Sequence, residues 1–136
     1  MTEKSIVILI SGRGSNMQAL IEACADSAYP AEIVVVICNV PGAAGLARAA
    51  AARIATLVID HKAYAEQSAF EDALHAALLA RKVDLICLAG FMRLLTGAFV
   101  GRWHDRLINI HPSLLPAFRG LHVHTRVIAY GARFSG

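Results

Sequence analysis

Asn109 and His111 stand two residues apart at the end of an apolar run, in the stretch LINIHPSLLPAFRGLHVH, residues 107–124. Side chains alternate along a strand, so we expect both side chains to point to one face and reach the same cleft. Asn109 can donate an N–H to a developing oxyanion, and His111 can move protons near neutral pH. The pair predicts acyl transfer to an amine. A histidine that is simply satisfied at a strand end is the alternative for His111 taken alone.

His122 and His124 form an HxH pair, to which His111 could add a third metal ligand. No cysteine lies nearby, and the only local carboxylate is Asp105. We therefore expect no metal. One of the two histidines, assigned to His122, is expected to contact substrate, while the other caps or packs.

The stretch SGRGSN, residues 11–16, follows the first apolar run of the chain. Two glycines in a strand-to-helix turn let backbone amides close on an anion, and the helix N-terminus adds a partial positive charge. A dinucleotide fingerprint needs glycine where Met17 stands and an acidic residue where Asn39 stands, and no GK[ST] is present for a P-loop. The turn predicts a phosphomonoester site. The alternative is a tight turn whose helix is capped by Ser15 or Asn16.

The stretch AGFMRLL, residues 89–95, follows the fourth apolar run. Its glycine lets a flat ligand approach the backbone, and Arg93 can meet an anion. The alternative makes the apolar side chains of this stretch core at the start of the next helix. Those side chains are Phe91, Met92, Leu94 and Leu95.

Strands and helices in alternation are expected to position these stretches. The apolar runs are β-branched and lack polar alternation, which is typical of parallel strands buried on both faces. The expected strands are residues 5–11, 31–38, 56–60, 83–89 and 106–110, and the expected helices are 16–25, 43–53, 65–81 and 97–103. The predicted fold class is α/β, a Rossmann-like parallel sheet with helices on both faces. Ligands in such sheets bind beyond the carboxyl ends of the strands.

The third expected helix has an apolar face with helical spacing. This face is formed by Phe70, Leu74, Ala77 and Leu78. Glu71, Asp72 and Arg81 are expected on the solvent side.

Composition indicates one domain without a membrane span. The 136 residues are 57% hydrophobic and 17% charged. The longest uncharged run, residues 33–47, is broken by Pro41 and Gly42 and is shorter than the ~18 apolar residues that a span needs. We find no signal peptide and expect a cytoplasmic protein. Three scattered cysteines in apolar segments predict buried free thiols in a reducing compartment: Cys24, Cys38 and Cys87.

The C-terminal third of the sequence is basic. From Arg93 onward, six arginines stand against Asp105 alone. This asymmetry suggests an anionic small ligand, a nucleic acid or a missing acidic remainder. Nucleic acid is the weakest of the three, because no basic cluster is interleaved with aromatics.

In this order and spacing, SGRGSN, AGFMRLL and NIHPSLLPAFRGLHVH closely resemble the phosphoribosylglycinamide formyltransferase family of purine biosynthesis. The resemblance covers essentially the whole chain, and NIHPSLLP is highly specific to the formyltransferase fold. It implies transfer of a formyl group from 10-formyltetrahydrofolate to the amine of 5-phosphoribosylglycinamide. The expected partners are these small molecules, bound by a monomer or homodimer, with no nucleic acid and no membrane.

The resemblance also assigns residues by position. The phosphate-binding turn falls on Gly14, Ser15, Asn16, Met17 and Gln18, and the folate-contacting segment on Met92, Arg93, Leu94 and Leu95. Asn109 and His111 are implied as the catalytic pair, with Asn109 also against the folate. Where the family often has an arginine that helps to hold the folate, this chain has Gln67. We expect that contact to be weaker or to shift to Lys62.

The resemblance places a catalytic aspartate beyond the HPSLLP loop, after a further strand. We expect residues 1–136 to be the N-terminal and central part of a single formyltransferase domain, with the last strands and helix of the family missing. The nearest substitutes are Asp60, Asp84 and Asp105. Without the aspartate, His111 is neither oriented nor tuned, so we expect the 136-residue form to be nearly inactive.

Two alternative functions remain open. The first is another folate formyl-handling enzyme of the same fold, methionyl-tRNA formyltransferase or formyltetrahydrofolate deformylase. These would bring an RNA-binding or a regulatory domain, and the SGRGSN turn favours a phosphoribosyl substrate over both. The second is a non-catalytic phosphate- and folate-binding module, which ligand binding without turnover would favour.

Overall fold

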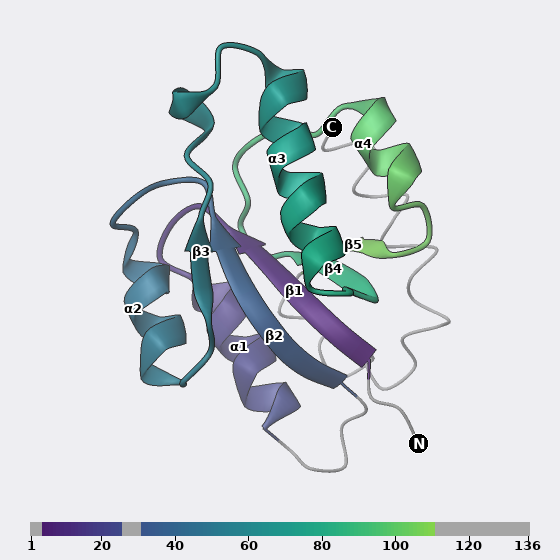
Figure 1. The fold of residues 1–136 in the computed structure, drawn as a ribbon. Coiled ribbons are helices and arrows are strands. Elements are labelled where there is room, and N and C mark those ends of the chain that lie inside the picture. The colour runs from purple at the N-terminus through teal and green to yellow at the C-terminus, as the bar shows by residue number, and fades with distance from the viewer. Residues whose placement is uncertain (1–3, 26–30, 111–136) are drawn as a thin grey trace.

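The computed structural model describes residues 4–25 and 31–110. They form a five-stranded parallel sheet with the strand order β3-β2-β1-β4-β5 (Figure 1). The strands are β1 (Lys4–Ile10), β2 (Ala31–Cys38), β3 (Thr56–Val58), β4 (Leu85–Leu88) and β5 (Leu107–Asn109). All five predicted strands are confirmed. The apolar pattern overestimates β3, β4 and β5, because Ile59, Ala89 and Ile110 stay buried just past the paired residues.

Helices cover both faces of the sheet, as predicted. The helices are α1 (Ser15–Cys24), α2 (Ala44–Ala51), α3 (Gln67–Ala80) and α4 (Gly97–Arg102), and a 3-10 helix, η1 (His61–Ala63), was not predicted. Met17 and Leu20 of α1 and Ala49 of α2 share one apolar cluster with three residues of β1, Ile6, Ile8 and Ile10. Helices α3 and α4 lie on the other face (Figure 1). Their side chains pack there with Val7 and Leu9, so β1 is buried on both sides.

The chain reverses its direction of travel across the sheet next to β1. It passes from β1 to β2 and β3 on one side, and then to β4 and β5 on the other. The carboxyl ends of β1 and β4 therefore lie at a topological switch point, where open α/β sheets bind their ligands. This topology decides which of the predicted segments meet.

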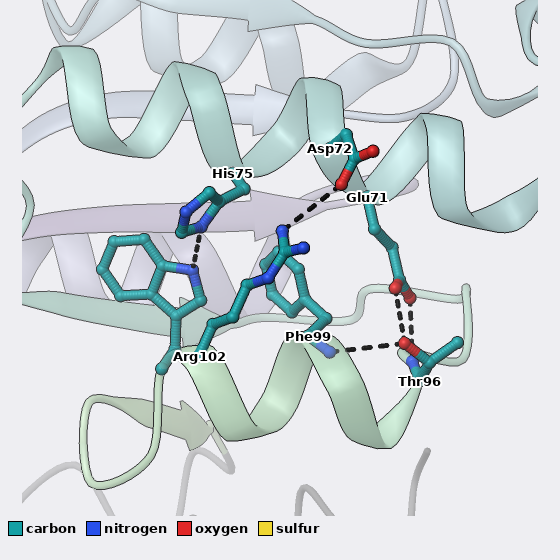
Figure 2. A network of polar contacts seen from close by, with 7 residues as sticks. Glu71, Asp72, His75, Thr96, Phe99 and Arg102 are labelled. Atoms are coloured by element: carbon teal, nitrogen blue, oxygen red, sulfur yellow. Dashed lines mark hydrogen bonds and ion pairs between the residues drawn. The ribbon is translucent and has the colours of Figure 1, made fainter.

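Glu71 corrects one prediction about α3. Its side chain was expected in solvent, but the residue is only 4% exposed. The carboxylate accepts hydrogen bonds from the backbone N–H and the hydroxyl of Thr96, at 2.8 and 2.5 Å (Figure 2). Burial is tolerated because these donors, which lie just before α4, replace water. The neighbouring Asp72 does face solvent and pairs with Arg102 (Figure 2).

The described residues hold no helix long and apolar enough to cross a bilayer. Cys38 and Cys87 are buried thiols without a disulfide, as predicted, whereas Cys24 is only partly buried.

Candidate active site

A cavity of about 620 Å³ lies at the carboxyl ends of β1, β2 and β4. It is lined by residues 11–16, 39–40, 89–90 and 92–93, together with His61. Two segments that are far apart in the sequence, the SGRGSN turn and the start of the AGFMRLL stretch, thus face one space. A cavity of this size at a switch point can hold a small-molecule ligand.

The turn before α1 exposes backbone amides to this cavity. Gly14 is the N-cap residue of α1, with φ 77° and ψ 28°, and no side chain caps the helix. The alternative in which Ser15 or Asn16 caps α1 is therefore wrong. A Cβ at Gly14 would lie 3.0 Å from the Cα of Gly45, so a left-handed backbone and a close neighbour both favour glycine. The first N–H groups of the helix have no acceptor within it and can bind an anion.

Met17 and Gln18, the last two residues assigned to the turn, make their contacts with other residues of this chain. The side chain of Met17 is fully buried in the core. The backbone N–H of Gln18 donates to the Gly14 oxygen at 2.8 Å, and its side-chain amide lies 3.4 Å from the Glu22 carboxylate. Their part in substrate binding stays a prediction, and this geometry favours support of the turn over direct contact.

The AGFMRLL stretch does not pack as core along its whole length. Met92 is 82% exposed and Leu94 67%, whereas Leu95 is 4% exposed. The alternative that made these residues core is wrong for Met92 and Leu94. The backbone there is not yet helical, since α4 begins only at Gly97, so the side chains do not follow a helical stripe.

Gln67 binds this segment directly. Its Oε1 accepts from Nη2 of Arg93 at 2.6 Å, and its Nε2 donates to the Leu94 carbonyl at 3.0 Å and to the Glu71 carboxylate at 2.9 Å. Both amide N–H groups and the amide oxygen are therefore engaged within the protein. Nε of Arg93, in contrast, is buried and has no hydrogen-bond partner among the described residues.

Three residues that the sequence motifs did not bring together join the ends of β1 and β2 to η1. The Ser11 hydroxyl lies 2.6 Å from Oδ1 of Asn39 and accepts from the Met92 N–H at 2.8 Å. Nδ2 of Asn39 lies 3.0 Å from Nδ1 of His61. The available signal was position alone, because Ser11 and Asn39 are the first polar residues after their strands.

Asn109 ends β5, paired in register with Leu88 of β4. This pairing puts it at the carboxyl edge of the sheet, on which the cavity also opens. His111, His122 and the rest of residues 111–136 lie outside the described residues, so their predicted roles stay predictions. Within the described ranges, no group of three His, Cys, Asp or Glu side chains could hold a metal ion.

The charge of the cavity wall favours an anion. Arg13 and Arg93 contribute two guanidinium groups, and none of the described residues that line the cavity is acidic. A phosphate at the turn would therefore meet backbone N–H groups and cations without a facing carboxylate.

These features define an α/β domain with a ligand site at its switch point. The chain belongs to the formyl transferase family, whose profile matches residues 4–136. The resemblance to phosphoribosylglycinamide formyltransferase that the motifs implied is confirmed.

Relatives and solved structures support this membership. The chain is 43% identical over 128 residues to phosphoribosylglycinamide formyltransferase of Haemophilus influenzae, covering 94% of this chain and 60% of that protein. It is 52% identical over 135 residues to trifunctional purine biosynthetic protein adenosine-3 of Drosophila melanogaster, covering 98% of this chain and 10% of that protein. The crystal structure of phosphoribosylglycinamide formyltransferase from Brucella melitensis matches with a TM-score of 0.79 and 52% identity, over 96% of this chain and 68% of that one.

Proposed function

We propose that this protein transfers a formyl group from 10-formyltetrahydrofolate to the amine of 5-phosphoribosylglycinamide. The observation that carries the proposal is the single cavity that the SGRGSN turn and the AGFMRLL stretch share at the switch point. The bacterial relatives from Haemophilus influenzae and Escherichia coli are named phosphoribosylglycinamide formyltransferase, which supports formyl transfer to this acceptor.

The ribonucleotide binds by its phosphate at the turn before α1. Backbone N–H groups from Gly14, Ser15 and Asn16 supply donors, and Arg13 adds positive charge. Met17 supports the turn from the core. Two substrates held in one cavity are brought to reacting distance, which removes much of the entropic barrier to transfer.

The formyl donor binds along residues 92–95. The exposed side chains of Met92 and Leu94 suit a flat, largely apolar ring, and Gln67 holds the segment through Arg93. Asn109 lies at the same edge of the sheet and faces the formyl group in this proposal.

The chemistry assigned to the site is nucleophilic acyl transfer. Asn109 donates its side-chain N–H to the formyl oxygen, where negative charge develops as the amine attacks the formyl carbon. His111 takes the proton that the amine loses and returns one to the folate nitrogen as the carbon–nitrogen bond to the donor breaks. The products are the formylated amide and tetrahydrofolate.

The test measures tetrahydrofolate release from 10-formyltetrahydrofolate by absorbance, with and without 5-phosphoribosylglycinamide. The chain spans 60% of the length of the Haemophilus influenzae relative, so the assay uses the protein at its natural length. We expect release only when the ribonucleotide is present. Asn109→Ala should lower kcat on the order of 100-fold, because one oxyanion donor is lost.

His104→Asn is the matched control, since the side chain of His104 is 70% exposed at the end of α4. It should retain the kcat of the unmodified protein. Release that is equal with and without the ribonucleotide would instead indicate hydrolysis of the donor and contradict the transferase assignment.

A further inference from the structure

We propose that His61 is a substrate-binding residue that donates its Nε2–H to the phosphate group in the cavity, and that Ser11 and Asn39 fix the tautomer that makes this possible. The inference deepens the proposed function and rests on it. His61 comes from η1, an element that the sequence did not predict, and it lines the cavity.

The backbone N–H of Met92 fixes which groups donate and which accept in the hydrogen-bonded chain from Met92 through Ser11 and Asn39. This N–H can only donate, so the Ser11 oxygen accepts at 2.8 Å. The Ser11 hydroxyl proton then goes to Oδ1 of Asn39, 2.6 Å away. Reversing the Asn39 amide would leave that proton without an acceptor among the described residues. Such a loss is costly because Ser11 is 8% and Asn39 only 2% exposed.

The orientation of the Asn39 amide determines which ring nitrogen of His61 carries the proton. Nδ2 of Asn39 carries hydrogens and lies 3.0 Å from Nδ1 of His61, whereas the backbone oxygen of Asn39 lies 3.2 Å from the same nitrogen. We assign Nδ1 as the acceptor of the shorter contact. A neutral imidazole whose Nδ1 accepts carries its proton on Nε2. If the ring gains a second proton, the backbone oxygen of Asn39 can accept from Nδ1 at 3.2 Å. Nε2 is therefore a donor in both protonation states, which suits anion binding and not general-base catalysis.

The ring of His61 is held in place against the core. It makes a T-shaped contact with Phe70, with ring centroids 6.4 Å apart and an interplanar angle of 83°. Asp60 caps η1 by accepting from the Lys62 N–H at 2.9 Å. A donor fixed in this way loses little side-chain entropy when a ligand binds.

The charge of the cavity indicates which ligand atom His61 meets. Arg13 and Arg93 share the wall with His61, and the described lining residues include no carboxylate that would compete for the Nε2–H. The phosphomonoester of the proposed ribonucleotide supplies charged acceptor oxygens at the turn that His61 faces across the cavity. His61 thus adds a side-chain donor to the backbone N–H groups of the turn.

The test is calorimetric titration of the full natural protein with ribose 5-phosphate, and separately with inorganic phosphate. We expect His61→Ala and His61→Asn to weaken the affinity for both probes about tenfold or more, the usual effect of losing a hydrogen bond to a charged group. His61→Gln should stay within about threefold of the unmodified protein, because its longer amide can place an N–H where Nε2 lay. His104→Asn, a surface histidine variant, should bind normally, and thermal unfolding of each variant checks the fold.

The possible outcomes separate this inference from the proposed function. If the unmodified protein binds ribose 5-phosphate and His61→Ala binds it equally well, the role of His61 is overturned while the proposed function stands. A loss confined to ribose 5-phosphate, with phosphate unaffected, would place the contact on the sugar and overturn the phosphate assignment. If the unmodified protein binds neither probe nor the ribonucleotide, both proposals fail.

Discussion

Cys87 shows how burial alone changes the chemistry of a side chain. The residue lies in the centre of β4, and burial raises the pKa of its thiol well above the ordinary value. Cys38, at the end of β2, has its pKa raised for the same reason, although a hydrogen bond that the Val40 N–H donates to its sulfur opposes the shift. Both thiols are thus kept protonated in the folded chain, which makes them poor nucleophiles.

The shift for Cys87 predicts a pH dependence of stability. Below the usual thiol pKa of about 8.5, folded and unfolded chains are both protonated and the thiol contributes no slope. Above it, the unfolded thiol ionises while the folded one does not, so the free energy of unfolding falls by about 1.4 kcal/mol per pH unit for each such thiol. Between neutral pH and about pH 10, the free energy of unfolding measured by urea denaturation should therefore fall less steeply for Cys87→Ala than for the unmodified protein. Equal slopes in the two proteins would show that Cys87 ionises normally in the folded chain.

At the scale of elements, α3 holds the segment that leads into α4. Glu71 receives hydrogen bonds from Thr96, and Gln67 receives one from Arg93 (Figure 2 shows the Glu71 contacts). Residues 93–96 are therefore held in place by side chains of α3. This contact connects the stability of α3 to the geometry of the proposed donor site.

Glu71→Gln should reduce the free energy of unfolding on the order of 2 kcal/mol. The carboxylate accepts from three N–H or O–H donors, and an amide cannot accept on both of its ends. The KM for the formyl donor should rise by more than that for the ribonucleotide, because residues 93–96 lose their support. Urea denaturation and steady-state kinetics measure the two effects.

Asp72→Asn is the matched control, one residue further along α3. Its ion pair with Arg102 is exposed, with side-chain exposures of 68% and 44%, so the change in stability should stay within about 0.5 kcal/mol. If the two variants behave alike, the proposed role of the Glu71 contact is wrong.

Helix α2 packs closely against the SGRGSN turn at Gly45. The Gly45 N–H donates to the Gly12 oxygen at 3.0 Å, and a Cβ at Gly45 would lie 2.5 Å from Cδ1 of Ile10 and 2.9 Å from that oxygen. Gly45→Ala should therefore cost about 1–3 kcal/mol of stability and weaken binding of ribose 5-phosphate. Denaturation and calorimetry test both effects.

Gly101→Ala provides the comparison within another helix. A Cβ there meets nothing within 4 Å among the described atoms, and alanine favours the helix by at most about 1 kcal/mol. This variant should be as stable as the unmodified protein or slightly more so. A loss of stability as large as that of Gly45→Ala would rule out crowding as the cause.

At the scale of the whole molecule, the two arginines of the cavity wall, Arg13 and Arg93, should attract the proposed anionic substrate. Raising the salt concentration from roughly 0.02 to roughly 0.5 M shortens the Debye length from about 20 to about 4 Å. The KM for the ribonucleotide should rise several-fold over this range, and the rise should be smaller for Arg13→Gln. A KM that is independent of salt would indicate that charge does not contribute to binding.

The sequence alone determined the elements, because their signals are local. Continuous β-branched runs between helical stripes require two covered faces, so five parallel strands and their helices followed from the chain. The SGRGSN turn was also local, since two glycines lie between a strand and a helix. Glu71 was misplaced because helical periodicity reports where a side chain points and not what it meets there.

Only the tertiary structure decided what the polar side chains do. Ser11, Asn39 and Met92 come from three separate parts of the chain, and the sheet order brings them within hydrogen-bonding distance. Gln67 meets Leu94 for the same reason, and η1 placed His61 on the cavity wall. Hydrogen bonds require partners at about 3 Å with defined directions, and periodicity along the chain carries no such information between distant residues. Burial patterns can therefore be predicted from the sequence, whereas the partners of each polar side chain depend on how the strands are ordered in the sheet.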